Sequence, residues 1–454
     1  MSKVKSKYIC QNCGYESAGY LGRCPDCGSW SSFLEEKICS STQQVVEDIP
    51  DKNPPMKLSE IVTNSEIRIS TGISELDRVL GGGIVQGSLV LIAGDPGIGK
   101  STILLQTSGV LCNLGKKVLY ISAEESANQI KLRAERLGIQ SENLYIYSQT
   151  NFELIKKHIE LMNPDLVVVD SIQAIYTSSI QSSAGSVSQI RECCNFLMSL
   201  AKINNVSIIV IGHVTKEGNI AGPKVLEHMV DTVIQFEGDK YKTYRILRSI
   251  KNRFGNTSEV GIFEMGERGL IEVINPSELF LKEYNQTQTP GSTIIVTNEG
   301  TRPLLVEIQA LVGVTPYPTP RRVANGVDVS RVLQILAVLE KRIGLNLSKQ
   351  DVYVNVIGGI DVSEPAADLG IALAIITCVR DVVFDSHTAI VGEIGLSGEI
   401  RAVNHIDKRI TEAKKLGFKR IIIPAANDVQ EHINEIEILK VQRIIEAITR
   451  SVKK

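Results

Sequence analysis

The chain has 454 residues, of which 43% are hydrophobic and 22% are charged, and its formal net charge at pH 7 is −2. This composition is typical of an ordinary soluble globular protein of about three domains. The near-neutral balance excludes a positive field over the whole molecule, so any contact with nucleic acid needs local patches. The longest apolar runs, such as Ile371–Val379, are too short to cross a bilayer, and no secretory segment follows the basic first residues. We therefore expect a cytoplasmic protein with no membrane partner.

Two pairs of cysteines near the start of the chain have the spacing of a metal site. Cys10 and Cys13 form one C-x2-C pair, Cys24 and Cys27 form the other, and a glycine follows each pair. Four thiolates that converge as a tetrahedron make a closed structural Zn²⁺ site, so we expect a zinc ribbon. A redox-active cysteine pair and an iron–sulfur cluster are the alternatives.

Changes in composition and periodicity divide the rest of the chain. Trp30, the single tryptophan, is expected to pack on the cysteine module, because that module is too small for a core of its own. Polar segments that contain proline read as linkers. We expect the ribbon at 1–38, a linker at 39–58, a nucleotide-binding domain at 59–274, a second linker at 275–292 and a last domain at 293–454.

A glycine-rich segment, Gly-Asp-Pro-Gly-Ile-Gly-Lys-Ser, fits the phosphate-binding pattern GxxxxGK[ST] in full. The apolar run Ser88–Ala93 precedes it as a strand and the run Thr102–Gln106 follows it as a helix, which is the context that this motif needs. Backbone N–H groups of such a loop surround the β-phosphate, and the helix N-terminus adds partial positive charge. The alternative is a glycine-rich turn that binds nothing. We expect ATP to contact Gly94, Asp95, Pro96, Gly97, Ile98, Gly99, Lys100, Ser101 and Thr102.

Strand and helix patterns alternate after this loop. Strands are expected at 117–122, 144–147, 166–170 and 207–211, and helices at 152–162 and 189–203. Because the strands are apolar throughout, both faces of their sheet must be covered. The sequence therefore predicts an α/β domain with a mostly parallel sheet.

Polar residues at the ends of these strands are the candidates for ATP hydrolysis. Asp170 closes an aliphatic strand at its carboxyl end, where it could hold Mg²⁺ together with Ser101. Glu124 could polarise the attacking water, Glu125 is its competitor, and the alternative for both is a favourable charge at the start of a helix. His213 follows another strand and is a candidate γ-phosphate sensor, although a lone histidine is often structural. Lys100 completes the set by reaching the β- and γ-phosphates.

Together these features resemble the RecA-type ATPase superfamily, and a second motif narrows the resemblance. That motif is Lys251, Asn252, Arg253, Phe254 and Gly255, and its combination with the cysteine ribbon resembles the bacterial RadA family, also called Sms. The resemblance covers nearly the whole chain.

The resemblance implies a homohexameric ring that hydrolyses ATP in a DNA-dependent, helicase-like manner. It implies branch migration of recombination intermediates in DNA repair, single-stranded and branched DNA as substrates, and the RecA recombinase as a partner. It also implies that Lys251 and Arg253 act as catalytic residues on the nucleotide of a neighbouring subunit. On pattern alone, a solvated basic turn is the alternative.

Candidate DNA contacts lie in two places. The loop that follows the 207–211 strand contains glycines with Lys216 and Lys224, and in RecA-type rings such loops face the central channel. Arg321 and Arg322 in the last domain are further candidates, against the alternative of ordinary surface charge.

The last domain resembles the α+β Lon protease domain without its chemistry. The family has Gly-Pro-Ser-Ala-Gly where this chain has Glu364–Asp368, so Ala366 stands at the position of the nucleophile. The position of the lysine base falls on Asp407, or on a neighbour if the alignment shifts. Because a serine–lysine mechanism needs the hydroxyl, we expect an inactive scaffold for ring assembly and DNA.

Two other functions stay open. The chain could be a nucleotide-controlled assembly or binding module without motor activity, or an ATP-dependent protease, against which Ala366 argues. A strand-exchange recombinase is a nearer rival within the motor class.

Overall fold

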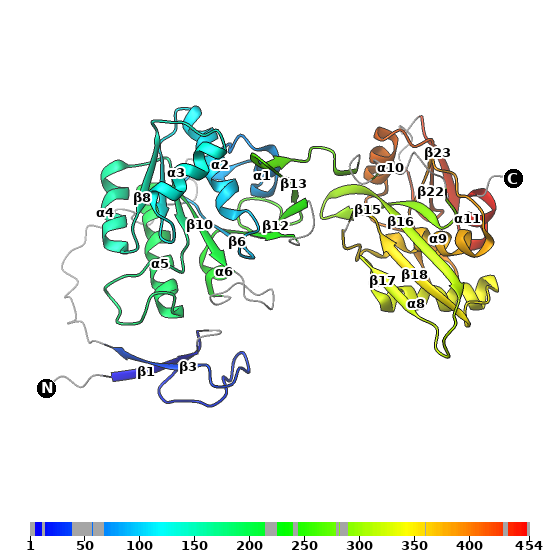
Figure 1. Ribbon diagram of the computed structural model, residues 1–454, viewed down its shortest axis with the longest axis horizontal. Coiled ribbons are helices and arrows are strands. Elements are labelled where there is room, and N and C mark those ends of the chain that lie inside the picture. Colours follow the sequence, from blue (N-terminus) through cyan, green and yellow to red (C-terminus); the bar gives the residue numbers. More distant parts are fainter. Residues whose placement is uncertain are drawn as a thin grey trace. The chain divides into compact units, whose positions relative to one another are not determined.

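The structure is a computed structural model that describes residues 5–10, 14–38, 57, 68–213, 225–238, 244–277, 281, 289–358, 360–429 and 435–451 (Figure 1). The chain divides into two compact units, Met1–Val273 and Ile274–Lys454. Within the described ranges, none of the helices has both the length and the apolar character that crossing a bilayer demands.

The first unit begins with a small antiparallel sheet of order β2-β1-β3. Its strands are β1 (Lys5–Cys10), β2 (Glu16–Ser17) and β3 (Phe33–Ile38). The core of this module consists of Cys10, Cys24 and Phe33, with Tyr8 packed against it.

Trp30 does not belong to that core, so the prediction that it packs on the module is wrong. Its side chain is 73% exposed, and the Arg23 guanidinium lies 5.7 Å from the centroid of its ring. The ring lies at the surface beside Arg23, outside the cluster of Cys10, Cys24 and Phe33.

A nine-stranded sheet of order β14-β13-β12-β11-β6-β10-β9-β7-β8 forms the centre of the first unit. The strands from β11 to β8 in this order are parallel, which confirms the predicted α/β class, and β12–β14 extend the sheet in antiparallel fashion. The bounds are β6 (Leu89–Gly94), β7 (Val118–Ser122), β8 (Leu144–Ser148), β9 (Leu166–Asp170), β10 (Ser207–His213), β11 (Thr232–Glu237), β12 (Tyr244–Asn252), β13 (Val260–Gly266) and β14 (Gly269–Glu272).

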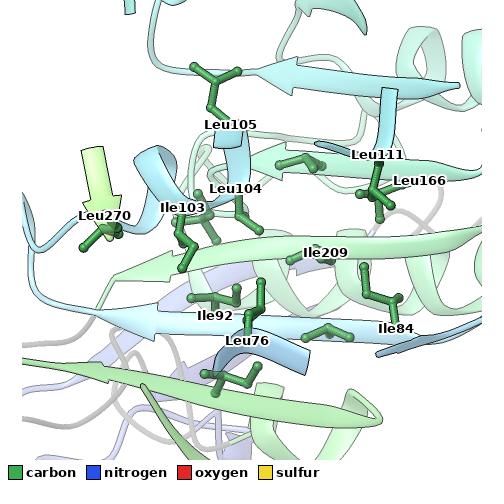
Figure 2. Packing of buried hydrophobic residues seen from close by; sticks show 14 of the residues in the cluster. Leu76, Ile84, Ile92, Ile103, Leu104, Leu105, Leu111, Leu166, Ile209 and Leu270 are labelled. Atoms are coloured by element: carbon green, nitrogen blue, oxygen red, sulfur yellow. The ribbon is translucent and has the colours of Figure 1, made fainter. Parts of the chain in front are cut away.

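Helices cover both faces of this sheet (Figure 1). On one face lie α1 (Ser74–Leu80), α2 (Lys100–Asn113) and α3 (Ala127–Arg136), and on the other lie α4 (Phe152–Met162), α5 (Val187–Asn204) and α6 (Val225–Met229). Side chains alternate along each strand, so β6 sends Val90 and Ile92 to the first face and Leu89 and Leu91 to the second. Figure 2 shows part of the first core, with Leu76, Ile84, Ile92, Ile103, Leu104, Leu105, Leu111, Leu166, Ile209 and Leu270.

Local sequence sets the ends of the helices that flank the nucleotide loop. After α2, Gly115 has φ +80°, its N–H donates to the Cys112 carbonyl, and the Lys116 N–H donates to the Leu111 carbonyl. This is the Schellman arrangement that a glycine permits. At the start of α3, Ser126 and Gln129 form a reciprocal capping box. These capping contacts set where α2 ends and where α3 begins.

The second unit has a seven-stranded mixed sheet of order β17-β18-β16-β15-β19-β22-β23, covered by helices, which is the α+β arrangement predicted for this part. Its strands are β15 (Ser292–Glu299), β16 (Arg302–Val314), β17 (Arg322–Asn325), β18 (Gln350–Val356), β19 (Thr388–Ile390), β22 (Arg420–Pro424) and β23 (Glu437–Val441). Its helices include α8 (Val329–Val338), α9 (Asp368–Arg380), α10 (Ile406–Lys415) and α11 (Ile444–Ser451).

The helix α9 packs closely on β15 because of one glycine. A Cβ added at Gly370 would lie 2.1 Å from Cγ2 of Ile295, and the Gly370 carbonyl accepts a hydrogen bond of 3.0 Å from the Thr293 hydroxyl. Because α9 begins at Asp368, this packing also fixes the segment that resembles the protease motif.

Candidate functional site

The nucleotide loop joins the carboxyl end of β6 to the start of α2, as its sequence predicts. Gly97 and Gly99 have φ of +78° and +121°, a region that side chains with a Cβ rarely adopt. A Cβ at Gly94 would lie 2.6 Å from the Phe236 carbonyl oxygen. These glycines therefore allow a turn tight enough for backbone N–H groups to surround a phosphate.

Lys100 is the buried cation of this loop. Its side chain is 4% exposed, and its Nζ donates to the carbonyl oxygens of Gly94, at 2.7 Å, and Asp95, at 2.8 Å. Burial lowers the pKa of Lys100, whereas the nearby carboxylates of Asp170, Asp95 and Glu124 oppose that shift. A buried cation at the N-terminus of a helix is suited to an anion such as a phosphate chain.

Asp170 ends β9 beside the loop and is the candidate magnesium ligand. Its Oδ2 accepts a hydrogen bond of 2.7 Å from the Tyr120 hydroxyl, and its carboxyl also accepts one from Ser101. Burial raises the pKa of Asp170. A hydroxyl and a buried carboxylate at one point are hard oxygen donors, so Ser101 and Asp170 fit Mg²⁺.

Glu124 lies two residues after β7 and contacts one residue that follows β9 and one that ends β10. Its Oε1 accepts a hydrogen bond from the Ser171 hydroxyl, and His213 Nε2 lies 3.3 Å from the same oxygen. The hydrogen bond with His213 is the main cause that lowers the pKa of Glu124 to about 2. The charge of Lys100 in the nucleotide loop lowers the pKa of Glu124 further. The carboxylate is therefore ionised throughout the physiological pH range.

Glu125 points elsewhere, although it is adjacent in sequence. Its carboxylate forms an ion pair with Arg133 of α3, and its carbonyl accepts a hydrogen bond of 2.7 Å from the Ser122 hydroxyl. The structure thus separates the two glutamates, which the sequence leaves equivalent. Glu124 contacts Ser171 and His213, whereas Glu125 pairs with Arg133 of α3.

The second motif begins with Lys251 at the end of β12. Its Nζ donates to the backbone carbonyls of Glu227, His228 and Val230 at 2.8, 3.2 and 2.8 Å. These carbonyls lie at the carboxyl end of α6, where a cation is favourable. Burial lowers the pKa of Lys251, and the charge of Arg253 lowers it further. In this chain Lys251 holds α6 in place.

Arg253 is the more exposed cation of the motif, with 54% of its side chain accessible. Its Nη1 lies 3.3 Å from Oδ1 of Asp231, and Asp231 is bonded through its backbone to Leu89 at the start of β6. The nucleotide loop follows Gly94 at the other end of β6, about 17 Å away at the rise of a strand. Arg253 therefore cannot reach the nucleotide of its own chain.

The remaining residues of the motif pack against the turn after α1. Asn252 donates from Nδ2 to the Leu80 carbonyl at 3.2 Å and accepts at Oδ1 from the Phe254 N–H at 2.9 Å. A Cβ at Gly255 would lie 3.1 Å from Cα of Gly81. Glycine is thus needed where the two backbones meet, and the motif is a structural unit as well as a basic turn.

Three of the four predicted metal ligands converge in the N-terminal module. The Sγ atoms of Cys10, Cys24 and Cys27 lie within 4.8 Å of one another, and those of Cys10 and Cys27 are 3.7 Å apart. Sulfur atoms of a tetrahedral Zn–S site with bonds of about 2.3 Å are about 3.8 Å apart, so the spacing fits. Cys13 lies outside the described residues.

In the second unit, the segment that resembles the protease motif is held by ion pairs. Ala366 is 2% exposed and has only a methyl group where the motif has a nucleophile. Glu364 pairs with Arg409, and Asp368 pairs with Arg331, whose Nε lies 2.8 Å from Oδ1. Two acids thus replace the two glycines of the motif, and each is neutralised by an arginine.

Arg409 is the basic residue that α10 brings to this segment. Asp407, expected at the lysine position, precedes it by two residues and so lies on a different side of the helix. Arg331 of α8 is bound to the Asp368 carboxylate, which is 1% exposed. Neither Arg409 nor Arg331 offers a protease base here.

Of the four candidate DNA contacts, the structure describes only the two arginines of the second unit. Lys216 and Lys224 lie outside the described residues. The Arg321 guanidinium is exposed and lies 3.9 Å from the centroid of the Tyr317 ring. Arg322 donates to the backbone carbonyls of Gln350 and Leu347. Of this pair, Arg321 presents its charge to solvent, whereas the Arg322 guanidinium is used in hydrogen bonds to the backbone.

Sequence reasoning missed several residues of these sites. Tyr120, Ser171 and Asp231 each bond to a predicted residue, and Arg409 neutralises Glu364. Ser171 had a weak signal, because it directly follows Asp170. Tyr120 and Arg409 lie in ordinary strand or helix patterns, Asp231 lies directly before β11, and none of the three carries a local signal.

Comparison with known proteins places these features in one family. Residues 8–35 match the family described as rubredoxin metal binding domain, 53–219 match AAA domain, and 327–427 match subunit ChlI of Mg-chelatase. The chain is 52% identical over 456 residues to a Bacillus subtilis protein named DNA repair protein RadA, with 99% of each chain covered. Proteins with the same name from Halalkalibacterium halodurans and Listeria monocytogenes are 52% and 50% identical over 430 and 459 residues, covering 94% and 99% of each chain. A KaiC-like protein of Pyrococcus horikoshii has a TM-score of 0.39 at 20% identity, over 46% of this chain and 99% of that chain.

Proposed function

Because this chain belongs to the RadA family of DNA repair proteins, we propose that it is a DNA-dependent, helicase-like ATPase that promotes branch migration of recombination intermediates. The observation that carries the proposal is the combination of a phosphate-binding loop at one end of the sheet with a cation, Arg253, at the opposite end of the same sheet. A site divided in this way suits a ring whose subunits act on one another's nucleotides.

Within one chain, each residue has a separate part in hydrolysis. Lys100 and the backbone of the loop hold the phosphates, and Ser101 and Asp170 would hold Mg²⁺, which supplies charge to the phosphate oxygens. Glu124 accepts a hydrogen bond from the attacking water and orients it. Because its pKa is about 2, it is a weak base, and its contribution is orientation more than proton abstraction.

His213 links the water-orienting glutamate to the strand that precedes the proposed DNA loop. His213 is the last residue of β10, and Lys216 and Lys224 follow it in the chain. A histidine in contact with Glu124 and directly followed by this loop in the chain is suited to link the γ-phosphate to the loop. This continuity supports coupling between DNA and hydrolysis.

The partners follow from the family and from the divided site. We propose a homohexameric ring, single-stranded and branched DNA as substrates, and the RecA recombinase as a protein partner. Arg321, next to Tyr317, is the candidate in the second unit for a contact with DNA, because an exposed guanidinium stacked on an aromatic ring suits phosphates and bases.

Steady-state ATP hydrolysis tests this function. Single-stranded and forked DNA are expected to stimulate turnover several-fold in the wild-type chain, because a motor hydrolyses ATP productively only on its track. The Lys100→Ala variant should lose both basal and stimulated turnover, since it lacks the phosphate-binding cation. A wild-type rate indifferent to DNA would leave a nucleotide-controlled binding module, and movement of a labelled branch point is the next measurement if stimulation is seen.

The metal of the ribbon is proposed to be Zn²⁺ in a structural role. Metal analysis of the purified protein is expected to give stoichiometric zinc and no iron, since four thiolates without an open position suit zinc. A Cys24→Ala variant should lose that zinc and lower the stability of the ribbon while the basal ATP turnover of the nucleotide site remains. Iron in the purified protein would overturn this assignment.

A further inference from the structure

Asp231 is a buried carboxylate with no part in the hydrolysis proposed above. Its side chain is 2% exposed, and it lies directly before β11. Two bonds join it to the start of the strand that leads to the nucleotide loop. Its N–H donates to the Leu89 carbonyl at 3.0 Å, and the Leu89 N–H donates to its Oδ2 at 3.1 Å. The position of this carboxylate is therefore fixed by the central sheet.

Two cations meet this fixed carboxylate. Lys202 Nζ lies 2.9 Å from Oδ2, and Arg253 Nη1 lies 3.3 Å from Oδ1. The backbone N–H of Arg253 also donates to the Asp231 carbonyl, at 3.2 Å. About half of each cationic side chain is exposed, at 49% for Lys202 and 54% for Arg253. The Asp231 carboxylate thus contacts each cation on one side. The rest of the Arg253 guanidinium faces solvent.

Such an arrangement limits the freedom of a long side chain before any partner arrives. An arginine on a surface turn normally samples many rotamers, and ordering it on binding costs free energy. A guanidinium already held by a rigid carboxylate has lost part of that freedom. Preorganised charge of this kind is what stabilises the charge of a phosphoryl-transfer transition state.

We propose that Asp231 is a positioning residue that aims the guanidinium of Arg253 at a nucleotide held by a neighbouring copy of this chain. The inference rests on the role in a neighbouring subunit proposed above for Arg253. The alternative is that Asp231 only ties β11 to β6 and to α5, in which case its charge would matter for stability and not for turnover.

A set of matched variants separates these possibilities. Turnover of Arg253→Ala is expected to fall by at least about a hundredfold. Asp231→Asn is expected to lose about tenfold, because it keeps the size and the backbone bonds but not the charge that holds the guanidinium. The double variant should be no slower than Arg253→Ala alone, since Asp231 acts through Arg253. Lys202→Met removes the other cation and should turn over as the wild type does. Thermal unfolding and nucleotide binding are measured for every variant.

Mixed rings supply a readout that a merely structural role would not move. Asp231→Asn chains have an intact nucleotide loop, and Lys100→Ala chains have an intact Arg253. Mixing the two variants should give more turnover than either gives alone, because some sites then combine both intact parts.

The outcomes distinguish the inference from the function on which it rests. Wild-type turnover in Arg253→Ala would remove the proposed role in a neighbouring subunit, and with it this inference. Loss in Arg253→Ala with wild-type turnover in Asp231→Asn would overturn the inference alone. Additive losses in the double variant, or no recovery in mixed rings, would also assign Asp231 to structure.

Discussion

Replacing Glu124 by Gln is expected to lower ATP turnover by about a hundredfold or more while binding of ATP is retained. The change keeps the size of the side chain and its contact with Ser171, but it removes the charge that orients the attacking water. Because the pKa of Glu124 is lowered to about 2, the loss should be the same throughout the physiological pH range, where the carboxylate is ionised. Turnover and the affinity for a fluorescent ATP analogue are the two measurements.

Glu125→Gln is the matched control for this prediction. Its carboxylate pairs with Arg133 within the neighbouring helix, so its loss should affect turnover only slightly. A greater loss of turnover in Glu125→Gln than in Glu124→Gln would reverse the assignment.

The second large effect concerns stability in the second unit. Glu364→Gln is expected to lower the free energy of unfolding by about 3 kcal/mol, because it leaves a buried cation without its counter-charge. The side chain of Arg409 is fully buried, with Nη1 2.6 Å from the Val296 carbonyl oxygen and Nε 3.0 Å from that of Asn404. The estimate is at the low end for a broken buried pair because Glu364 is 26% exposed. Denaturant unfolding of the full chain, followed by far-ultraviolet circular dichroism, gives the value.

Glu437→Gln is the control for that measurement. Its partner Arg420 lies on the surface, with 41% and 58% of the two side chains exposed, so the change should fall within error. If Glu364→Gln unfolded at the same denaturant concentration as the wild type, the ion pair would not be what holds the segment that resembles the protease motif.

These ion pairs bear on why the second unit keeps the protease-like segment. Ala366 lacks the hydroxyl that a serine nucleophile needs. The carboxylates of Glu364 and Asp368 beside it would each destabilise the fold if they were not paired with Arg409 and Arg331. Both arginines come from helices distant in the sequence, so the segment joins α8, α9 and α10. The scaffold role expected for the domain stays a prediction.

The sequence by itself determined the features that depend on local spacing. The nucleotide loop, its flanking strand and helix, the paired cysteines and the apolar strands of a parallel sheet are all read within a few residues of one another. Such patterns are reliable because the turn, the helix start and the covered strand each impose their own local requirement. The same reasoning was wrong for Trp30, because composition does not say whether a side chain of a small module faces its interior or the solvent.

Only the tertiary structure decided which side chains meet. Glu124 and Glu125 are neighbours in the chain, and it is Ser171 and His213, at the carboxyl ends of two other strands, that distinguish them. Tyr120 reaches Asp170 across 50 positions of sequence. The physical reason is that strands adjacent in a parallel sheet are separated in the chain by whole helices, so their carboxyl ends share an edge that no local pattern describes.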